Sequence, residues 1–244
     1  MFHDVDVDAV LDELERDGLS RRFRLPPAIV GEIVSYAHAT RCYGDRDLSS
    51  GFLYAERDQR FLTAAYVNTA LECDAIRRLS HDKTLLEIAA RYLRCPEPVL
   101  QSANLTWSFP VDATDRERSL AAQVFHYDLD DYRFLKLFFY VTDVAAGNGP
   151  HQCVVGTHRH KRLRDQIRFG RRTDQYVATT YGSDNIVTLL GPAGFGFAED
   201  TRCFHRGIPP TTGDRLLFQL AFARTDYGVL KDDPANMRPL RDPT

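Results

Sequence analysis

The sequence predicts an α+β, mainly β protein: a double-stranded β-helix, or cupin-like jelly roll, with an N-terminal helical layer. Two observations predict this fold. Apolar side chains recur at helical spacing through the first hundred residues, and from Val99 onward short runs of Val, Phe, Leu and Tyr alternate with Gly, Asn, Asp and Pro clusters. Successive strands without helical patterns between them favour an antiparallel barrel or jelly roll over a parallel α/β sheet.

The expected helices lie in the N-terminal part. Apolar residues of 7–14 follow helical spacing, and the proline pair at 26–27 stands where the first turn of a second helix tolerates proline. The segment 61–79 is rich in Ala and Leu and has no Gly or Pro, so it predicts a third helix. Asp82 is a suitable N-cap for a fourth helix over 83–93.

Short apolar runs predict the strands. They cover 100–109, 119–127, 134–142, 152–156, 186–190, 194–199 and 215–223. A lid-like insertion at 161–185 interrupts them and carries arginines with little apolar periodicity: Arg162, Arg164, Arg168, Arg171 and Arg172. It predicts either a solvated face or a lid that attracts an anionic substrate, such as a carboxylate, a phosphate or a coenzyme A conjugate.

Length and composition are typical of one globular domain over 1–244, with 1–98 as mostly helical support and 99–225 as the β-helix core. The chain has 244 residues, of which 43% are hydrophobic and 27% charged. A formal net charge of -3 gives no general attraction for nucleic acid or an anionic membrane. No apolar run reaches the roughly 18 to 20 residues that span a bilayer.

Further patterns concern location and redox state. The acidic start MFHDVDVDAV does not resemble a signal peptide, so we expect a cytoplasmic protein. The five cysteines are scattered and form no C-x-x-C pair, which argues against a disulfide framework and against a zinc knuckle. No heptad or long exposed apolar stripe indicates an oligomeric state.

The strongest chemical signal is the H-x-D of VFHYDLD. His126 and Asp128 are two residues apart at the end of an expected strand, so both side chains point to the same face and can share one metal ion. His205, on a later strand, is the best third ligand. Two histidines and one carboxylate form a facial triad, which leaves open positions on iron(II) for a chelating co-substrate and dioxygen. An H-x-D alone is weak evidence, because a strand end at the surface can carry one by chance.

Arg215 strengthens this interpretation. It begins the apolar strand RLLFQLAFA, ten residues after His205. An arginine can form a bidentate pair with a carboxylate, and a buried carboxylate of a co-substrate needs such a partner. A structural ion pair at the strand start is the alternative for Arg215.

Three segments resemble the phytanoyl-CoA dioxygenase family of iron(II)- and 2-oxoglutarate-dependent oxygenases, and together they cover the β half. They are HYD, FFYVTDVAAGNGPHQCVVGTHR and GFGFAEDTRCFHRGIPPTTGDR. The resemblance implies that His126, Asp128 and His205 hold Fe(II) and that Arg215 binds the distal carboxylate of 2-oxoglutarate, with O2 as oxidant.

The resemblance also implies further co-substrate contacts. Phe138 matches an aromatic position of the family pocket, and alternation places Lys136 and Tyr140 on the same inward face. Lys136 is a second candidate partner for a carboxylate, or else a solvent-facing residue of an edge strand. Thr157 stands at the small polar residue of the family's P-G-S-H signature, whose proline is Val155 here, and Gln123 is a further candidate.

Other residues are candidates for binding the substrate. They are Trp107, Asn104, Tyr127 and Arg202. Core packing is the stronger alternative for Trp107. The remaining histidines of the β half, His151, His158 and His160, are expected to be solvated or structural.

These observations favour a dioxygenase that hydroxylates an unactivated C–H bond of a small molecule and releases succinate and CO2. Desaturation, cyclisation and epoxidation are not distinguished from hydroxylation, and the substrate is not indicated, because loops set specificity on such folds. Two other classes are open: a cupin metalloenzyme that does not use 2-oxoglutarate, and a catalytically silent jelly-roll binding protein.

Overall fold

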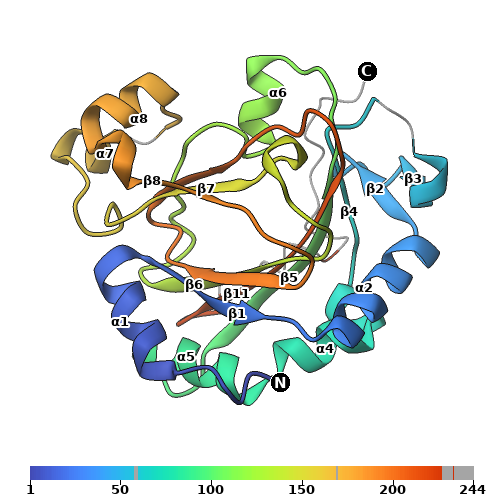
Figure 1. Cartoon of the computed structure of the whole chain (residues 1–244), viewed down its shortest axis with the longest axis horizontal. Helices are drawn as coiled ribbons and strands as arrows, with labels where there is room; N and C mark the ends of the chain where they lie inside the picture. Colours follow the sequence, from blue (N-terminus) through green and yellow to red (C-terminus); the bar gives the residue numbers. More distant parts are fainter. Residues whose placement is uncertain (58–59, 169, 227–232, 234–244) are drawn as a thin grey trace.

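The computed structural model describes residues 1–57, 60–168, 170–226 and 233. Its strands form two facing antiparallel sheets, and helices cover the outer face of the larger sheet (Figure 1). The larger sheet has the order β1-β9-β6-β11-β5-β4-β2-β3, and the smaller has the order β10-β7-β8. This arrangement is the predicted double-stranded β-helix with a helical layer.

The bounds of the elements are as follows. The strands are β1 (Leu19–Arg24), β2 (Cys42–Gly44), β3 (Gly51–Phe52), β4 (Thr63–Ala65), β5 (Val99–Ser108), β6 (Phe134–Tyr140), β7 (His151–Val154), β8 (Ile186–Leu189), β9 (Phe195–Glu199), β10 (Phe204–Gly207) and β11 (Arg215–Ala223). The α-helices are α1 (Val7–Asp17), α2 (Pro27–Ala39), α3 (Thr69–Glu72), α4 (Asp74–Ser80), α5 (Lys83–Leu93), α6 (Asp115–Leu120), α7 (Leu163–Ile167) and α8 (Asp174–Tyr181). Three 3-10 turns are η1 (Tyr54–Glu56), η2 (Ala146–Asn148) and η3 (Ser183–Asn185).

Local capping explains the helices that the sequence predicted well. The Asp82 side chain accepts hydrogen bonds from the backbone N–H groups of Thr84 and Leu85 and thereby starts α5, as predicted. Asp6 caps α1 in the same way, and Gly18, with φ 74°, ends that helix in the left-handed conformation.

The prediction for the N-terminal part missed two features. The expected helix over 61–79 begins instead with β4, and α3 and α4 follow it. In addition to the five helices α1 to α5, four strands that were not expected lie within the described residues of 1–98: β1 joins the large sheet beside β9, and β4 extends it beyond β5 with β2 and β3. These strands are two to six residues long and are stabilised by distant partners, so local composition does not reveal them.

The expected strand over 119–127 is also wrong. Residues 115–120 form α6, which begins with a capping box: the Thr114 side chain accepts from the Glu117 N–H, and the Glu117 carboxylate accepts from the Thr114 N–H. Only isolated bridges at Phe125 and His126 remain of the strand.

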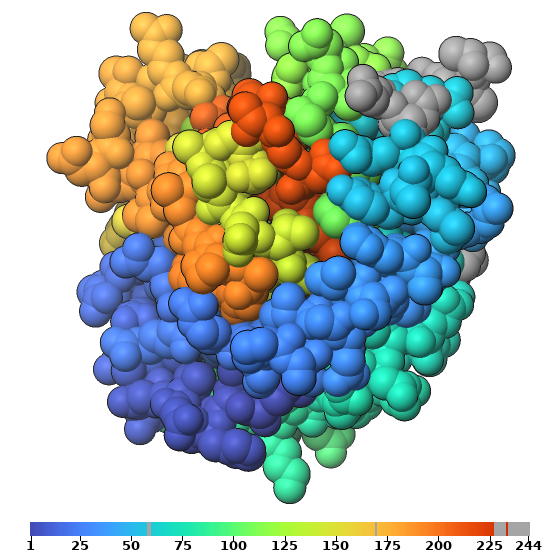
Figure 2. Space-filling view, turned by 45° about the vertical axis from the view of Figure 1, so that its right-hand side comes forward, coloured from blue at the N-terminus to red at the C-terminus, as the bar shows by residue number. Residues whose placement is uncertain are grey.

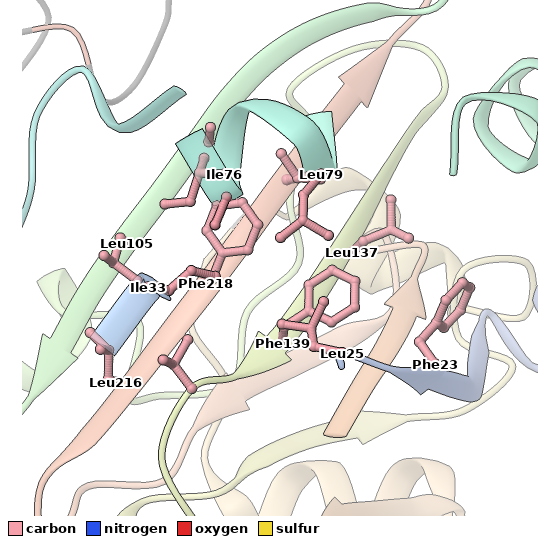
Figure 3. Close-up of a cluster of buried hydrophobic side chains, with 14 of the residues drawn as sticks. Phe23, Leu25, Ile33, Ile76, Leu79, Leu105, Leu137, Phe139, Leu216 and Phe218 are labelled. Carbon is pink, nitrogen blue, oxygen red and sulfur yellow. The ribbon is translucent and has the colours of Figure 1, made fainter. Parts of the chain in front are cut away.

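Period-two alternation divides each long strand between two environments. On β6, Leu137 and Phe139 face the helices, whereas Lys136 and Phe138 face the interior between the sheets. Figure 3 shows the helix-facing cluster, in which side chains of α2 and α4 pack on those of β5, β6 and β11. The larger hydrophobic core therefore lies outside the barrel, and the interior holds a smaller apolar cluster next to the polar cavity.

Helices α7 and α8 lie within the predicted 161–185 insertion. In Figure 2 they project on one side of the molecule (light orange), and the residues that follow β2 lie on the other side (cyan). Among the helices of the described residues, none is long and apolar enough to cross a bilayer.

Candidate metal centre and its cavity

A backbone pair brings two of the three predicted ligands together. His126 and His205 form an isolated antiparallel bridge, in which each backbone N–H donates to the carbonyl of the other, at 3.0 and 2.8 Å. The Asp128 N–H donates to the Thr201 carbonyl at 2.8 Å and holds the same loop against the β9–β10 connection. The three side chains therefore meet between segments that are far apart in the sequence.

The ligand atoms form one cluster. One atom from each of His126, Asp128 and His205 lies within 4.8 Å of the other two. Nε2 of His126 is 3.7 Å from Oδ1 of Asp128, and Nε2 of His205 is 3.7 Å from Oδ2 of Asp128. Within the described residues this is the group of His, Cys, Asp or Glu side chains that could hold a metal ion.

Both histidine rings are held by backbone carbonyls. Nδ1 of His126 is 3.0 Å from the Val124 carbonyl, and Nδ1 of His205 is 3.0 Å from the Cys203 carbonyl. A carbonyl can only accept, so each Nδ1 carries the proton and each Nε2 presents a lone pair to the cluster. Burial and the neighbouring His205 hold the pKa of His126 well below its usual value, which keeps this ring neutral.

The carboxylate of the cluster is bound by a buried lysine. Nζ of Lys136 is 2.6 Å from Oδ2 of Asp128 and 2.9 Å from Oδ2 of Asp130. Burial raises the pKa of Asp128, but Lys136 and the two histidines outweigh it and hold that pKa well below the ordinary value. Lys136 therefore does not face solvent on an edge strand, because β6 lies between β9 and β11.

The cluster opens into a cavity of about 230 Å³. Its wall includes the three candidate ligands and residues of β4, β5, β6, β10 and β11. The charged, polar and aromatic side chains of the wall include Arg46, Asn104, Thr106, Lys136, Phe138, His151, Arg215 and Gln219. The predicted inward positions Lys136, Phe138, Asn104 and Arg215 thus share one space with the triad.

Arg215 is a buried cation without a carboxylate partner among the described residues. It is 7% exposed, its guanidinium donates to the Ser108 hydroxyl at 3.1 Å and to the Gly149 carbonyl, and its Nε has no partner there. Burial lowers its pKa. The alternative of a structural ion pair is therefore wrong within the described residues. A buried guanidinium without a carboxylate partner is costly unless a ligand pairs with it.

His151 is structural, which is one of the two expected alternatives, and it is not solvated. It is buried, it lines the cavity, and its ring stacks on that of His205 with centroids 5.6 Å apart. Its Nε2 lies 2.7 Å from Oε2 of the fully buried Glu199. Burial and the positive charge of Arg215 lower the pKa of His151 to about 3, and burial raises the pKa of Glu199 to about 8, so the pair is neutral between these values. Its position after a Gly-Pro turn gave no signal of burial.

Three expected co-substrate contacts do not line the cavity. The Tyr140 hydroxyl donates to the Leu189 carbonyl at 2.8 Å and accepts from the His151 N–H at 3.0 Å, within the core between the sheets. The Thr157 hydroxyl donates to the Val154 carbonyl and accepts from the Phe204 N–H, so it supports the start of β10 next to His205. Gln123 is buried in the connection after α6, outside the cavity wall.

The prediction of Trp107 as a cavity wall is wrong, and the core interpretation holds. Trp107 is on the helix-facing side of β5, its indole N–H donates to the Tyr66 hydroxyl at 3.0 Å, and its ring stacks on Tyr54 with centroids 4.1 Å apart. Alternation explains the error, because the neighbouring Thr106 takes the inward position.

Tyr127 and Arg202 lie away from the triad. They line a separate cavity of about 250 Å³ that His158 and Lys161 also line. Tyr127 follows His126 and points to the opposite side, and Arg202 forms an ion pair with the buried Asp200. Neither residue contacts the cavity of the triad.

A larger hollow of about 670 Å³ lies between the α1–β1 region and β8. None of the three candidate metal ligands lines it, so its size does not connect it with the chemistry.

The basic insertion was expected to be either a solvated face or a lid that attracts an anionic substrate, and its arginines differ in this respect. Arg172 forms an ion pair with Asp165, and its N–H donates to the Phe125 carbonyl beside the triad loop. Arg171 is exposed, and its side chain makes no hydrogen bond or ion pair with any other described residue, although its charge acts on Asp128 and His126.

The donor set fits a divalent transition metal. Two neutral imidazoles with free Nε2 atoms and one ionised carboxylate match the two-histidine, one-carboxylate facial triad of non-haem iron proteins. The orphaned Nε of Arg215 in the same cavity fits an additional anionic ligand.

Comparison with known proteins supports the fold. No protein-family model matches the chain, and no curated protein sequence matches it. Among solved structures, AviO1 from Streptomyces viridochromogenes Tue57 is 18% identical, with a TM-score of 0.60 over 92% of this chain and 96% of that chain. HygX from Streptomyces hygroscopicus, with nickel and 2-oxoglutarate bound, is 16% identical, with a TM-score of 0.61 over 90% and 87%.

A third similar structure is SnoN, a non-haem, α-ketoglutarate-dependent epimerase from nogalamycin biosynthesis. It is 16% identical, with a TM-score of 0.59 over 89% of this chain and 82% of that chain. At such identities the likeness shows the fold, which extends over most of each chain.

Proposed function

We propose that this chain is a non-haem iron(II)- and 2-oxoglutarate-dependent oxygenase. His126, Asp128 and His205 hold the metal, and Arg215 binds the distal carboxylate of 2-oxoglutarate. One observation carries the proposal: a cluster of two histidines and one aspartate shares a cavity with a buried guanidinium that has no carboxylate partner among the described residues. A cupin that does not use 2-oxoglutarate has no need for this arginine.

The similar structures support the same cofactors. HygX contains nickel and 2-oxoglutarate, and SnoN has been solved with Fe3+ and α-ketoglutarate. The metal when bound would supply oxidation by O2 coupled to the conversion of 2-oxoglutarate to succinate and CO2. The chain supplies the positions: backbone pairing orients the two imidazoles, and Lys136 holds Asp128 in its ionised form.

Hydroxylation of a C–H bond in a small molecule is the reaction that we propose. Related structures include the epimerase SnoN and the non-haem monooxygenase ThoJ, so different outcomes occur on this fold. Two of them contain small molecules, hygromycin B in HygX and nogalamycin RO in SnoN. We also propose that the chain belongs to the phytanoyl-CoA dioxygenase family, which its sequence motifs resemble.

Anaerobic titration tests the proposal. The purified apoprotein is titrated first with iron(II) and then with 2-oxoglutarate, while the weak visible charge-transfer band of the iron chelate is recorded. We expect the band to appear, to be lost in His205→Ala, and to persist in His160→Ala, which changes an exposed histidine outside the cavity. Folded protein that gives no band would reject the proposal and favour a different metalloenzyme or a binding protein.

A further inference from the structure

Arg46 is held on the wall of the cavity by an unusual backbone. It belongs to the connection between β2 and β3, where Asp45 and Arg46 both have positive φ, 48° and 63°. The Asp45 carboxylate fixes this turn, because its Oδ1 accepts from the N–H groups of Leu62 and Thr63, each at 3.1 Å. Left-handed backbone is unfavourable for side chains with a Cβ and persists where the surroundings enforce it.

The guanidinium of Arg46 is unpaired within the described part of the chain. It makes no hydrogen bond or ion pair there, whereas other arginines near the cavity do: Arg57 pairs with Asp214, and Arg206 with Asp174. Arg46 is exposed, and it lines the cavity that also contains the triad, so its charge is available to an anion that enters from solvent.

The other charges of the centre are already matched. Lys136 binds Asp128 and Asp130, and a dianionic co-substrate would be matched by the metal and by Arg215. Arg46 is then a surplus cation in a cavity whose co-substrate already has its own arginine. A surplus cation of this kind favours an anionic group on a second ligand.

Part of the wall that Arg46 and the triad share is polar. Asn104 of β5 stands opposite Gln219 of β11 in the register, both line the cavity, and Thr106 lies beside them. None of these three side chains donates to or accepts from another described residue in a hydrogen bond. Such a wall binds hydroxyl, amide or carboxylate groups and would leave its own polar groups unpaired against a long acyl chain.

Arg171 is a second exposed cation, and its charge acts on His126 and Asp128. The bridge between Phe125 and Arg172 places Arg171 next to the loop that carries His126. An anionic molecule that approaches the triad loop therefore meets the charge of Arg171 in addition to that of Arg46.

We propose that the primary substrate is a small polar molecule with a carboxylate, phosphate or sulfate group, that Arg46 binds this oxyanion, and that Asn104 and Gln219 bind polar atoms nearer the metal. The proposal rests on the proposed function, since the site is a substrate site only if the triad is catalytic. It excludes a neutral lipid as substrate.

Calorimetry with inorganic sulfate tests the anion site. The protein is first loaded with nickel and saturated with 2-oxoglutarate, so that Arg215 is occupied, and sulfate is then titrated in a buffer of low ionic strength. We expect one saturable site that Arg46→Gln weakens by about tenfold or more, the loss of a charge-assisted interaction. Arg46→Lys should keep most of the affinity, and Arg164→Ala, an exposed arginine outside the cavity, should keep all of it.

The outcomes separate this inference from the proposed function. Failure of the nickel-loaded protein to bind 2-oxoglutarate would reject the proposed function. Normal binding of 2-oxoglutarate, with sulfate affinity that is the same in Arg46→Gln and the parent protein, would overturn the inference alone. Arg46→Gln that weakens 2-oxoglutarate and not sulfate would also overturn it, because Arg46 would then be a co-substrate ligand. Because Gln has a Cβ as Arg does, the backbone strain at position 46 is the same in Arg46→Gln and in the parent protein.

Discussion

The ammonium group of Lys136 lies 2.6 Å from Oδ2 of Asp128, so a buried cation from the middle of the large sheet is bound to the carboxylate of the candidate triad. The same ammonium binds Asp130 at 2.9 Å. A metal ion would therefore bind a carboxylate that already forms an ion pair, because Lys136 keeps Asp128 ionised in the metal-free protein.

Lys136→Met should destabilise the metal-free protein by about 3 kcal/mol, because two partly buried carboxylates lose their cation. A divalent metal would then restore part of this loss, so that the thermal shift on addition of nickel should be larger in Lys136→Met than in the parent. Denaturant unfolding with and without nickel measures both. A smaller shift in the variant would show that Lys136 is needed for metal binding, and Lys83→Met, an exposed lysine at the start of α5, is the control.

Asp128→Ala should abolish tight metal retention and turnover. It removes the anionic donor of the cluster while both imidazoles keep the carbonyl partners that orient them. Metal content after dialysis, together with the charge-transfer band, measures the effect. Unchanged metal content would remove Asp128 from the triad.

Arg215→Gln should raise the 2-oxoglutarate concentration needed for half-saturation by about tenfold to a hundredfold and leave metal affinity almost unchanged. The reason is the loss of a buried charge-assisted contact with the distal carboxylate. Titration of the iron-loaded protein measures it, and Arg78→Ala, whose guanidinium pairs with Glu32 on the helical layer, is the matched control. Equal losses of metal and of 2-oxoglutarate would contradict the assigned role.

The neutral pair of His151 and Glu199 predicts a stability plateau. The pKa of Glu199 is raised from 4.5 to about 8, so this group makes the metal-free protein less stable as pH rises through that interval. The pKa of His151 is lowered from 6.5 to about 3, so this group makes the protein less stable as pH falls through its interval. The two slopes cancel between pH 4.5 and 6.5.

Glu199→Gln should remove the decline above the plateau. Relative to its own value at pH 6.5, the variant should be more stable than the parent at pH 8 by about 2 kcal/mol, from roughly 1.4 kcal/mol per pH unit. Urea unfolding at several pH values tests this. Parallel profiles of the variant and the parent would show that Glu199 ionises normally in the folded protein.

Trp107→Phe should reduce stability and leave 2-oxoglutarate binding intact. The variant loses the hydrogen bond to Tyr66 and part of the ring stack on Tyr54, at a cost of about 1–3 kcal/mol. Chemical denaturation and co-substrate titration of the same preparation separate the two effects. A change of co-substrate affinity at unchanged stability would return Trp107 to the cavity wall.

Features with local causes were predictable from the sequence. The start of α5 depends on one capping side chain, Asp82, and β11 is a mostly apolar run that follows a Gly-Asp turn; the structure confirms both. The pair of His126 and Asp128, and Arg215 ten residues after His205, are short-range signals, and the structure brings all four residues into one cavity.

Features with distant causes were not predictable. β1 is a strand because β9 lies beside it, and the burial of His151 depends on β10 and β8, which flank β7 on either side. The local sequence around Arg46 does not predict a cavity residue. Arg46 lines the cavity because the Asp45 carboxylate holds the turn that contains both residues. The α6 capping box was present in the sequence at Thr114 and Glu117 and could have prevented the incorrect strand.

The reciprocal backbone hydrogen bonds between His126 and His205 have a consequence for how the protein acquires its metal. Because main-chain groups, and not the ion, align the two ligands, little ordering of the chain is left for the ion to impose. Small zinc domains behave differently, since they remain unfolded until they are loaded. This chain should fold first, persist as a folded apoprotein, and take up or exchange its metal afterwards without passing through an unfolded state.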